Sequence, residues 1–186
     1  NVLTSPELNA WCMAGGKMAI YTGLLQKVEP TDDELAQVMG HEISHALANH
    51  TAERMSVAMA SQLGVIAVGL GTDSAGNAAL AQGAALLAVT LPNSRASETE
   101  ADRIGIELAA KAGYDPRSAA TLWQKMATAG GNGPPQFLST HPAPGNRQAT
   151  LAALAPQMMQ YYEAPGPRPV YPLSRALPAP VPAKPK

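Results

Sequence analysis

Two histidines and a glutamate in His41-Glu42-Ile43-Ser44-His45 have the residue types and spacing of a metal-dependent hydrolytic site. Each residue of an α-helix advances by about 100°, so His45 lies about 40° and Glu42 about 100° around the axis from His41. Two imidazoles on one face can hold a zinc ion, while the adjacent carboxylate accepts a proton from water on that ion. Because a surface helix can carry three such positions by chance, the pentapeptide alone is a hypothesis.

A second acidic segment offers the third protein ligand that a catalytic zinc ion needs. Glu98 and Asp102 are four residues apart, which places them about 40° apart on one helical face. We predict Glu98 as the third ligand, with one position left for water, and Asp102 as the acceptor for the outer N–H of a zinc-bound histidine. Glu100 lies about 200° from Glu98 and is expected to face solvent, with Arg103 as a partner. An ordinary solvated acidic face is the competing interpretation.

The two remaining histidines require separate interpretations. His50 is nine residues past His41, about 180° around an unbroken helix, so we expect a structural histidine and not a ligand. Thr51 stands where a longer zinc motif has its third histidine. His141 precedes Pro142 in a loop that could fold back over the site, and a surface histidine is the alternative.

The helix that must carry the first motif is predicted to begin at Thr31. Thr31 is a suitable N-cap, and Glu34 three residues on completes a capping box. The helical pattern continues to about Arg54. Its buried face is predicted to consist of Leu35, Val38, Met39, Ile43, Ala46 and Leu47, which recur mostly at steps of three and four.

Glycines and prolines delimit the other elements. Gly15 and Gly16, followed by Lys17, indicate a turn between two short strands around Trp11–Met13 and Met18–Leu25. Further helices are expected at about Ser97–Ala112, Arg117–Thr128 and Gly145–Tyr162.

The runs Val57–Leu70 and Ala78–Val89 are rich in alanine and glycine and are separated by the polar segment Thr72–Asn77. Each is shorter than the roughly 20 residues that span a bilayer, so neither predicts a transmembrane helix. A close-packed helical hairpin and a mobile or membrane-facing flap over the site are the two interpretations. Residues 163–186 are proline-rich and lack periodicity, which predicts a catalytic domain over residues 1–162 and an extended tail over 163–186.

The composition of the 186 residues indicates one domain of predominantly helical type. Hydrophobic residues make up 46% and aromatic residues only 4%, which favours close-packed helices over a β-sandwich. A net charge of −1 without a polybasic run argues against a nucleic-acid partner or an anionic membrane surface. Cys12, the only cysteine, excludes an internal disulfide and a multi-thiolate metal site. The first residues lack the pattern of a signal peptide.

Several segments in this order resemble one group of zinc peptidases. The matching segments are His41–His45, Ser94–Arg95, Glu98–Gly105, Leu138–Pro142 and Arg147, preceded by Asn9–Ala10, Gly15–Gly16 and Thr22–Leu25. The group includes the CAAX prenyl proteases, the HtpX-type membrane proteases, the mitochondrial Oma-type peptidases and the periplasmic barrel-assembly-enhancing protease. The similarity extends from about Asn9 to Leu154, and the combination is highly specific.

The resemblance implies a gluzincin-type α+β fold, predominantly helical, with a small sheet packed against the helix that carries His41–His45. It implies a Zn²⁺ cofactor and places His141 and Arg147 near it. In some relatives the equivalent histidine caps the metal and holds the enzyme inactive, or helps to stabilise the oxyanion. The chain lacks the integral-membrane helices of the prenyl-protease and HtpX branches and is similar to the soluble bacterial branch. This implies a periplasmic or cell-envelope location, with membrane association through an N-terminal lipid anchor at the outer membrane as a further option.

The implied function is zinc-dependent endopeptidase activity on protein or peptide substrates in envelope protein quality control. Zinc acidifies a water molecule, Glu42 accepts its proton and later passes it to the leaving amine, and His141 or Arg147 stabilises developing charge. The strand expected to pair with an extended substrate through its free edge consists of Met18, Ala19, Ile20 and Tyr21.

Two other functions remain open. A latent zinc protein with a chaperone-like or scaffold role would keep its metal capped by His141. A purely structural zinc site would unfold on metal removal. Glu42 argues against the structural site, because such a site needs no base beside the metal.

Overall fold

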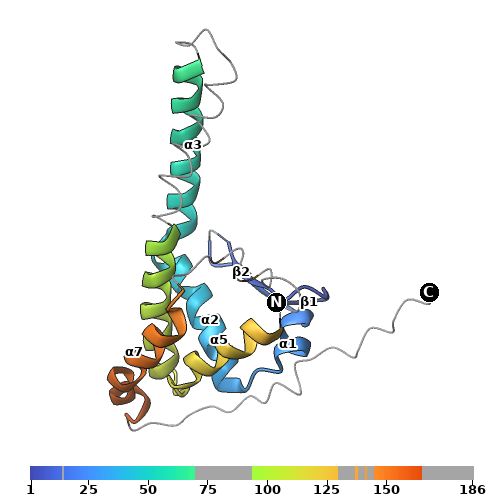
Figure 1. The fold of residues 1–186 in the computed structure, drawn as a ribbon, viewed down its shortest axis with the longest axis vertical. Helices are drawn as coiled ribbons and strands as arrows, with labels where there is room; N and C mark the ends of the chain where they lie inside the picture. Colours follow the sequence, from blue (N-terminus) through green and yellow to red (C-terminus); the bar gives the residue numbers. More distant parts are fainter. Residues whose placement is uncertain (14, 70–93, 130–136, 138–140, 142–144, 165–186) are drawn as a thin grey trace, which may run out of the picture.

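The computed structural model describes residues 1–13, 15–69, 94–129, 137, 141 and 145–164, and the side chains of all of these except 61–69. Helices dominate, and a small sheet lies beside them (Figure 1). The predicted α+β, mostly helical fold is therefore confirmed. The predicted tail lies outside the described residues beyond residue 164, as does the predicted run Ala78–Val89 with the turn before it.

The sheet has three strands in the order β1-β3-β2. β2 (Ala10–Cys12) runs antiparallel to β3 (Met18–Tyr21), and Gly15 and Gly16 in the connection have positive φ angles of 85° and 74°. Glycine adopts this backbone conformation without steric cost, so the predicted turn is confirmed. β1 (Val2–Leu3) pairs with β3 in parallel.

The central position of β3 corrects one prediction. Ile20 pairs with Val2 on one side and with Ala10 on the other, so both edges of the strand are occupied. Met18–Tyr21 therefore cannot bind a substrate by adding a strand, because its backbone groups already bond within the sheet. The expected strand also ends earlier than Leu25, since α1 (Thr22–Val28) begins directly after β3.

α2 (Asp32–Leu47) begins as the sequence predicts. The Thr31 hydroxyl accepts a hydrogen bond from the Glu34 backbone N–H at 3.2 Å, and Glu34 Oε2 accepts one from the Thr31 N–H at 2.9 Å. Glu34 Oε2 also accepts a hydrogen bond from Lys125 Nζ at 2.6 Å. This bond connects the start of α2 to another helix, α5 (Ser118–Ala129). The capping box thus fixes the first turn of α2, and its Glu34 also holds α2 against α5.

The end of α2 differs from the expected continuous helix to Arg54. α2 stops at Leu47, Asn49 has a φ angle of 57°, and α3 (His50–Gly69) starts as a new helix. Asparagine tolerates this left-handed conformation better than most residues, so it suits a sharp break between helices.

The helix over residues 94–111 crosses α2 at two glycines. A Cβ atom on Gly40 would lie 2.6 Å from the Gly105 carbonyl oxygen, and one on Gly105 would lie 2.8 Å from the His41 backbone nitrogen. Both distances are too short for real side chains, so only glycine permits this contact. The two backbones touch beside His41, which sets the position of the acidic helix relative to the histidines.

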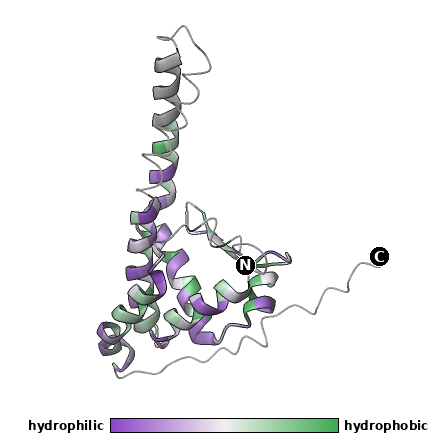
Figure 2. Ribbon diagram, in the orientation of Figure 1, coloured by the Kyte–Doolittle hydropathy of each residue, from purple (hydrophilic) through white to green (hydrophobic). Residues whose placement is uncertain are grey.

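A hydrophobic core lies beneath these elements. It combines side chains of α1, α2, the 94–111 helix, α5 and α7 (Arg147–Tyr162), and its most deeply buried members include Leu24, Val38, Ile106, Leu122, Met126, Phe137 and Leu151. Figure 2 shows that these helices carry both hydrophobic and hydrophilic residues, as helices with one buried face do. The bounds of the last three helices agree with the predicted ones to within a few residues.

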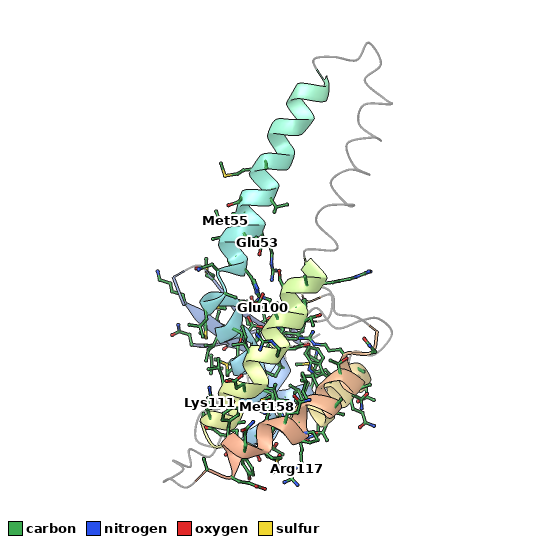
Figure 3. The ribbon with its side chains drawn as sticks, turned by 90° about the vertical axis from the view of Figure 1, so that its left-hand side faces the viewer. Glu53, Met55, Glu100, Lys111, Arg117 and Met158 are labelled. Carbon is green, nitrogen blue, oxygen red and sulfur yellow. The ribbon has the colours of Figure 1, made fainter. Side chains whose placement is uncertain are left out.

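α3 projects away from the other helices (Figures 1 and 3). Its residues Met55 and Met59 are exposed. Within the described residues, no helix combines the length and the apolar character needed to cross a membrane.

Candidate metal centre

α2 turns the three chemically important residues of its motif inward. His41, Glu42 and His45 are all at most 3% exposed. Burial of three ionisable groups is costly unless they are hydrogen-bonded, paired or bound to a metal. The helix therefore presents these side chains to partners from other elements.

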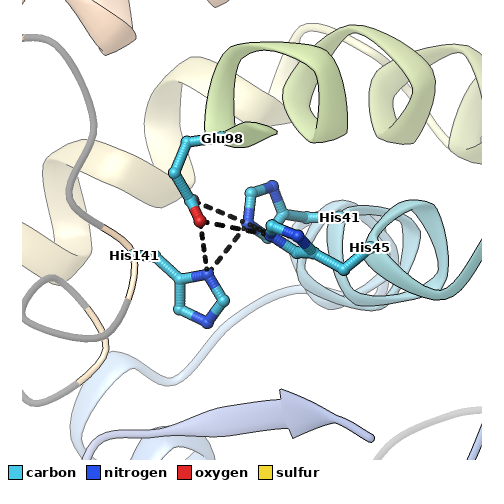
Figure 4. Close-up of side chains that lie close together, drawn as sticks. All are labelled: His41, His45, Glu98 and His141. Atoms are coloured by element: carbon cyan, nitrogen blue, oxygen red, sulfur yellow. Dashed lines mark hydrogen bonds and ion pairs between the residues drawn. The ribbon is translucent and has the colours of Figure 1, made fainter. Parts of the chain in front are cut away.

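Glu98 and His141 meet the two histidines at one point (Figure 4). His41 Nε2 lies 3.0 Å from His45 Nε2, 3.3 Å from His141 Nδ1 and 3.2 Å from Glu98 Oε2. Glu98 Oε1 lies 3.3 Å from His45 Nε2 and 3.2 Å from His141 Nδ1. We call His41, His45, Glu98 and His141 the four-residue cluster.

The spacing within the four-residue cluster fits a zinc ion. Tetrahedral zinc with bonds of about 2.0–2.1 Å places neighbouring ligand atoms about 3.3 Å apart. Five pairs of donor atoms in the cluster lie 3.0–3.3 Å apart, and one donor atom from each residue lies within 4.8 Å of the others. In addition, Glu98 Oε2 is buried, and among the described residues no donor meets it with hydrogen-bond geometry, although His41 Nε2 lies 3.2 Å away. A buried carboxylate oxygen without a donor and a matching set of nitrogens together fit a cation at their centre.

Burial and hydrogen bonding shift the pKa values of His45 and Glu98 toward the protonation states that a metal needs. Burial lowers the pKa of His45 to about 4, which keeps its ring neutral near pH 7. Burial alone would raise the pKa of Glu98, but hydrogen bonds to His141, His41 and His45 bring it far below the usual range. His45 and Glu98 thus supply a neutral imidazole and an ionised carboxylate.

Glu42 lies next to the cluster without joining it. Its Oε1 atom is 3.4 Å from His141 Nε2 and receives no hydrogen bond from the described residues. A cleft of about 140 Å³ opens here, and its lining residues are Asn9, Ala10, Trp11, Cys12, Glu42, His45, Thr51, Arg54 and His141. β2 forms one wall of this cleft, and none of the residues Met18–Tyr21 lines it.

Asp102 lies behind His41, which identifies the histidine that the sequence alone left open. Its Oδ1 atom is 2.9 Å from His41 Nδ1 and accepts a hydrogen bond from Arg147 Nη2 at 2.5 Å. Burial opposes a charge on His41, but its bonds with Asp102 and Glu98 raise its pKa. The guanidinium of Arg147 also stacks 3.5 Å from the centre of the Trp123 ring.

Arg147 lies in a different place from the one its expected role requires. It is buried beside Asp102 and His41 and is not among the residues that line the cleft. Its Nη2 atom lies 3.0 Å from His41 Nδ1 and 3.3 Å from His41 Nε2, and its Nη1 atom lies 3.6 Å from Glu98 Oε2, so it contacts residues of the four-residue cluster and not the cleft. The expected direct stabilisation of an oxyanion by Arg147 is therefore not supported by the geometry.

His50 and Glu100 meet on the outer side of His45. His50 Nδ1 lies 3.0 Å from His45 Nδ1, and His50 Nε2 lies 3.3 Å from Glu100 Oε2. His50 is a buried residue outside the four-residue cluster, as predicted, and Glu100 is half exposed, as predicted. The partner that we expected for Glu100 was Arg103, whereas the structure pairs it with His50.

Three contributors were missed by the sequence reasoning. These are the β2 wall of the cleft, the Trp123 ring under Arg147, and Phe137, whose ring stacks on His141 with centroids 4.4 Å apart. Phe137 had a local signal, because it lies only four residues before His141 in the sequence. Trp123 and β2 had none, since only long-range packing brings them here.

Comparison with known proteins finds similarity to metal-dependent peptidases. A model of peptidase family M48 matches residues 1–155. The mitochondrial metalloendopeptidase OMA1 of Arabidopsis thaliana is 39% identical over 151 residues, covering 81% of this chain and 30% of that protein. Human mitochondrial OMA1 is 36% identical over 176 residues, covering 88% of the chain and 33% of that protein. The β-barrel assembly-enhancing protease of Escherichia coli is 32% identical over 171 residues, with coverages of 84% and 34%.

These relatives include both the mitochondrial and the bacterial types that the sequence resembles, and the mitochondrial ones share more identical residues. The chain spans about a third of the length of each.

Proposed function

The chain belongs to peptidase family M48, and from this premise we propose that it carries the active site of a zinc-dependent endopeptidase that cleaves protein or peptide substrates. The observation that supports this most directly is the four-residue cluster, with the Glu42 carboxylate at its edge. A buried base beside three or four metal-binding groups is useful for hydrolysis and has no use in a purely structural site.

The residue roles follow from position. His41, His45 and Glu98 hold the metal, and Asp102 fixes the ring of His41 by accepting its Nδ1–H. Zinc, when bound, supplies Lewis acidity toward water and toward the peptide carbonyl. Glu42 accepts the proton of the attacking water and delivers it to the leaving amine.

β2 replaces β3 as the proposed substrate strand. β2 pairs with β3 on one side, and in the described residues no strand pairs with its other side. Its residues Ala10–Cys12 line the cleft together with Glu42 and His141. An extended peptide that bonds to this edge would pass next to the proposed base.

His141 supports a second candidate function, a latent state. Its Nδ1 atom lies within 3.3 Å of both His41 and Glu98, where a fourth ligand would lie. A metal capped in this way has no position for water, which would leave the protein inactive until His141 moves. A latent scaffold or chaperone-like role requires that this cap persists, whereas in the protease it is displaced by substrate.

For location, we propose the cell envelope, with a role in protein quality control and membrane association through an anchor outside this sequence. The support is the similarity to the E. coli relative, whose name refers to β-barrel assembly. Fractionation of the source cells with an antibody against the chain tests this location, and recovery only in the cytosol would contradict it.

Replacement of Glu42 by glutamine tests the proposed base. The Glu42→Gln variant should bind zinc as the wild type does and should lose casein cleavage by at least a hundredfold, because the amide cannot accept the proton. Zinc content and cleavage rate are measured on the same samples, with Glu53→Gln on α3 as the control. An unchanged cleavage rate in Glu42→Gln would refute the mechanism.

Replacement of His141 by alanine separates the two candidate roles of that residue. If His141 caps the metal at rest, His141→Ala should raise cleavage of casein or of the chain itself. If it stabilises developing charge, the same variant should lower the rate by about 10²–10³-fold. The comparison uses equal zinc occupancy, determined by metal analysis of both proteins.

A further inference from the structure

The outer face of His45 has a structural partner that the proposed metal site does not explain. His45 directs Nε2 toward the cluster, and its Nδ1 atom faces away and lies 3.0 Å from His50 Nδ1. His50 is 2% exposed, and its Nε2 atom lies 3.3 Å from Glu100 Oε2. The Glu100 side chain is 52% exposed and lies on the 94–111 helix near the base of α3 (Figure 3).

The number of hydrogens on the ring nitrogens determines which atom donates and which accepts in each of these contacts. Two ring nitrogens 3.0 Å apart form a hydrogen bond only if one carries a hydrogen and the other does not. If His45 Nε2 binds a metal, the hydrogen of its neutral ring must be on Nδ1. His50 Nδ1 is then the acceptor, and the hydrogen of a neutral His50 ring is on Nε2, where the Glu100 carboxylate accepts it.

We propose that His50 and Glu100 are positioning residues for His45, and that they fix its tautomer and ring orientation through the hydrogen-bond chain Glu100–His50–His45. This inference rests on the proposed metal site, and it assigns to His45 what Asp102 supplies to His41. Each α2 ligand then has an acceptor behind it. One is a carboxylate in direct contact, and the other is a carboxylate that acts through an imidazole.

Arg54 is the competing neighbour of His45. Its Nη2 atom lies 3.2 Å from the same Nδ1 atom, and its side chain is 43% exposed. A guanidinium has no acceptor, so it cannot receive the Nδ1–H of a metal-bound His45. Arg54 can remain near Glu98 Oε1, 3.6 Å away, while His50 serves as the acceptor.

The break between α2 and α3 makes this contact possible. In an unbroken helix His50 would lie about 180° from His41 and would face away from the cluster. The left-handed residue Asn49 redirects the chain so that the first residue of α3 returns toward His45. The left-handed conformation of Asn49, which few residue types adopt, thus places His50 behind the ligand His45.

Zinc affinity of the purified chain tests the inference. The metal is titrated in competition with a chromogenic chelator, and the thermal stability of each metal-free protein is measured in parallel. His50→Phe keeps a ring of similar shape but has no acceptor, so its zinc affinity should fall about 10- to 100-fold. His50→Gln should recover part of the loss, because its amide oxygen can accept the Nδ1–H.

Glu100→Leu provides a second, independent variant. Glu100 is half exposed, so the substitution should not unfold the protein. It should weaken zinc binding by about tenfold, at the lower end of the range for such outer partners. Glu107→Gln on the same helix removes a carboxylate that pairs with Lys111, and it should leave zinc affinity unchanged.

The outcomes separate this inference from the proposed function. Wild-type affinity in both His50→Phe and Glu100→Leu, beside tight binding by the wild type, would overturn the positioning role alone. A lower thermal stability of the metal-free variants with unchanged zinc affinity would assign His50 to the fold only and would also overturn it. Failure of the wild-type chain to bind zinc would overturn both the inference and the proposed function.

Discussion

Asp102 and Arg147 form a pair behind His41 that links the site to the core. Asp102 contacts both His41 Nδ1 and Arg147 Nη2 through the same oxygen atom. The Trp123 ring supports the guanidinium from its face, as cation–π pairs do. At the scale of single residues, the orientation of His41 thus depends on the planar guanidinium of Arg147, which is held in place by the Trp123 ring.

Arg147→Lys tests that dependence while conserving the charge. A lysine ammonium lacks the planar fork and stacks poorly on Trp123, so Asp102 loses its support. We expect zinc affinity to fall by about tenfold and protease activity to fall with it. Chelator competition measures the affinity. Arg117→Lys, at an exposed position paired with Asp115, is the control, and equal affinities in the two variants would contradict this view.

At the scale of elements, the crossing of α2 and the 94–111 helix decides where the ligands meet. Gly40 and Gly105 bring the two backbones into contact one residue before His41 and three residues after Asp102. Neither helix alone contains the complete site. The two glycines therefore set how closely the ligands of the two helices approach one another.

Gly105→Ala should disturb this crossing. Its Cβ atom would lie 2.8 Å from the His41 backbone nitrogen, so the helices must separate. Overpacking costs about 1–3 kcal/mol, and higher helix propensity returns at most about 1 kcal/mol. We expect a net loss of about 1–2 kcal/mol in the free energy of unfolding, together with weaker zinc binding. Urea denaturation measures the first quantity, and Gly145→Ala, where a Cβ meets nothing within 4 Å, is the control.

At the scale of the whole molecule, the hydrophobic core and the metal centre are distinct. The hydrophobic core is built from apolar side chains of the sheet and of α1, α2, the 94–111 helix, α5 and α7, and it includes none of the four-residue cluster. It includes Phe137, which stacks on His141. We therefore expect the core to keep the domain folded when no metal is bound.

Metal removal tests this separation. Treatment with a chelator should abolish activity and lower the melting temperature but leave the far-UV circular dichroism near its original value at 25 °C. A ligand at a hundred times its Kd stabilises a protein by about 2.7 kcal/mol. This is smaller than the usual free energy of unfolding of about 5–15 kcal/mol, so loss of the metal alone should not unfold the domain. Glu98→Gln should show little further response to the chelator. Complete unfolding of the wild type on chelation would instead indicate a structural zinc site.

Helical spacing alone was sufficient to group His41, Glu42 and His45, to pair Glu98 with Asp102 and to locate the capping box at Thr31. These relations hold between neighbours in the chain, because the hydrogen bonds of a helix fix the angle from each residue to the next.

The family resemblance already implied that His141 lies near the metal. Only the tertiary structure decided that Arg147 lies behind His41, that β3 is central and that His50 turns back toward His45. Strand order, loop return and the break at Asn49 depend on packing between residues that are far apart in sequence. No local angle encodes such packing. The His41–His45 motif therefore specified the chemistry, and the fold specified its surroundings.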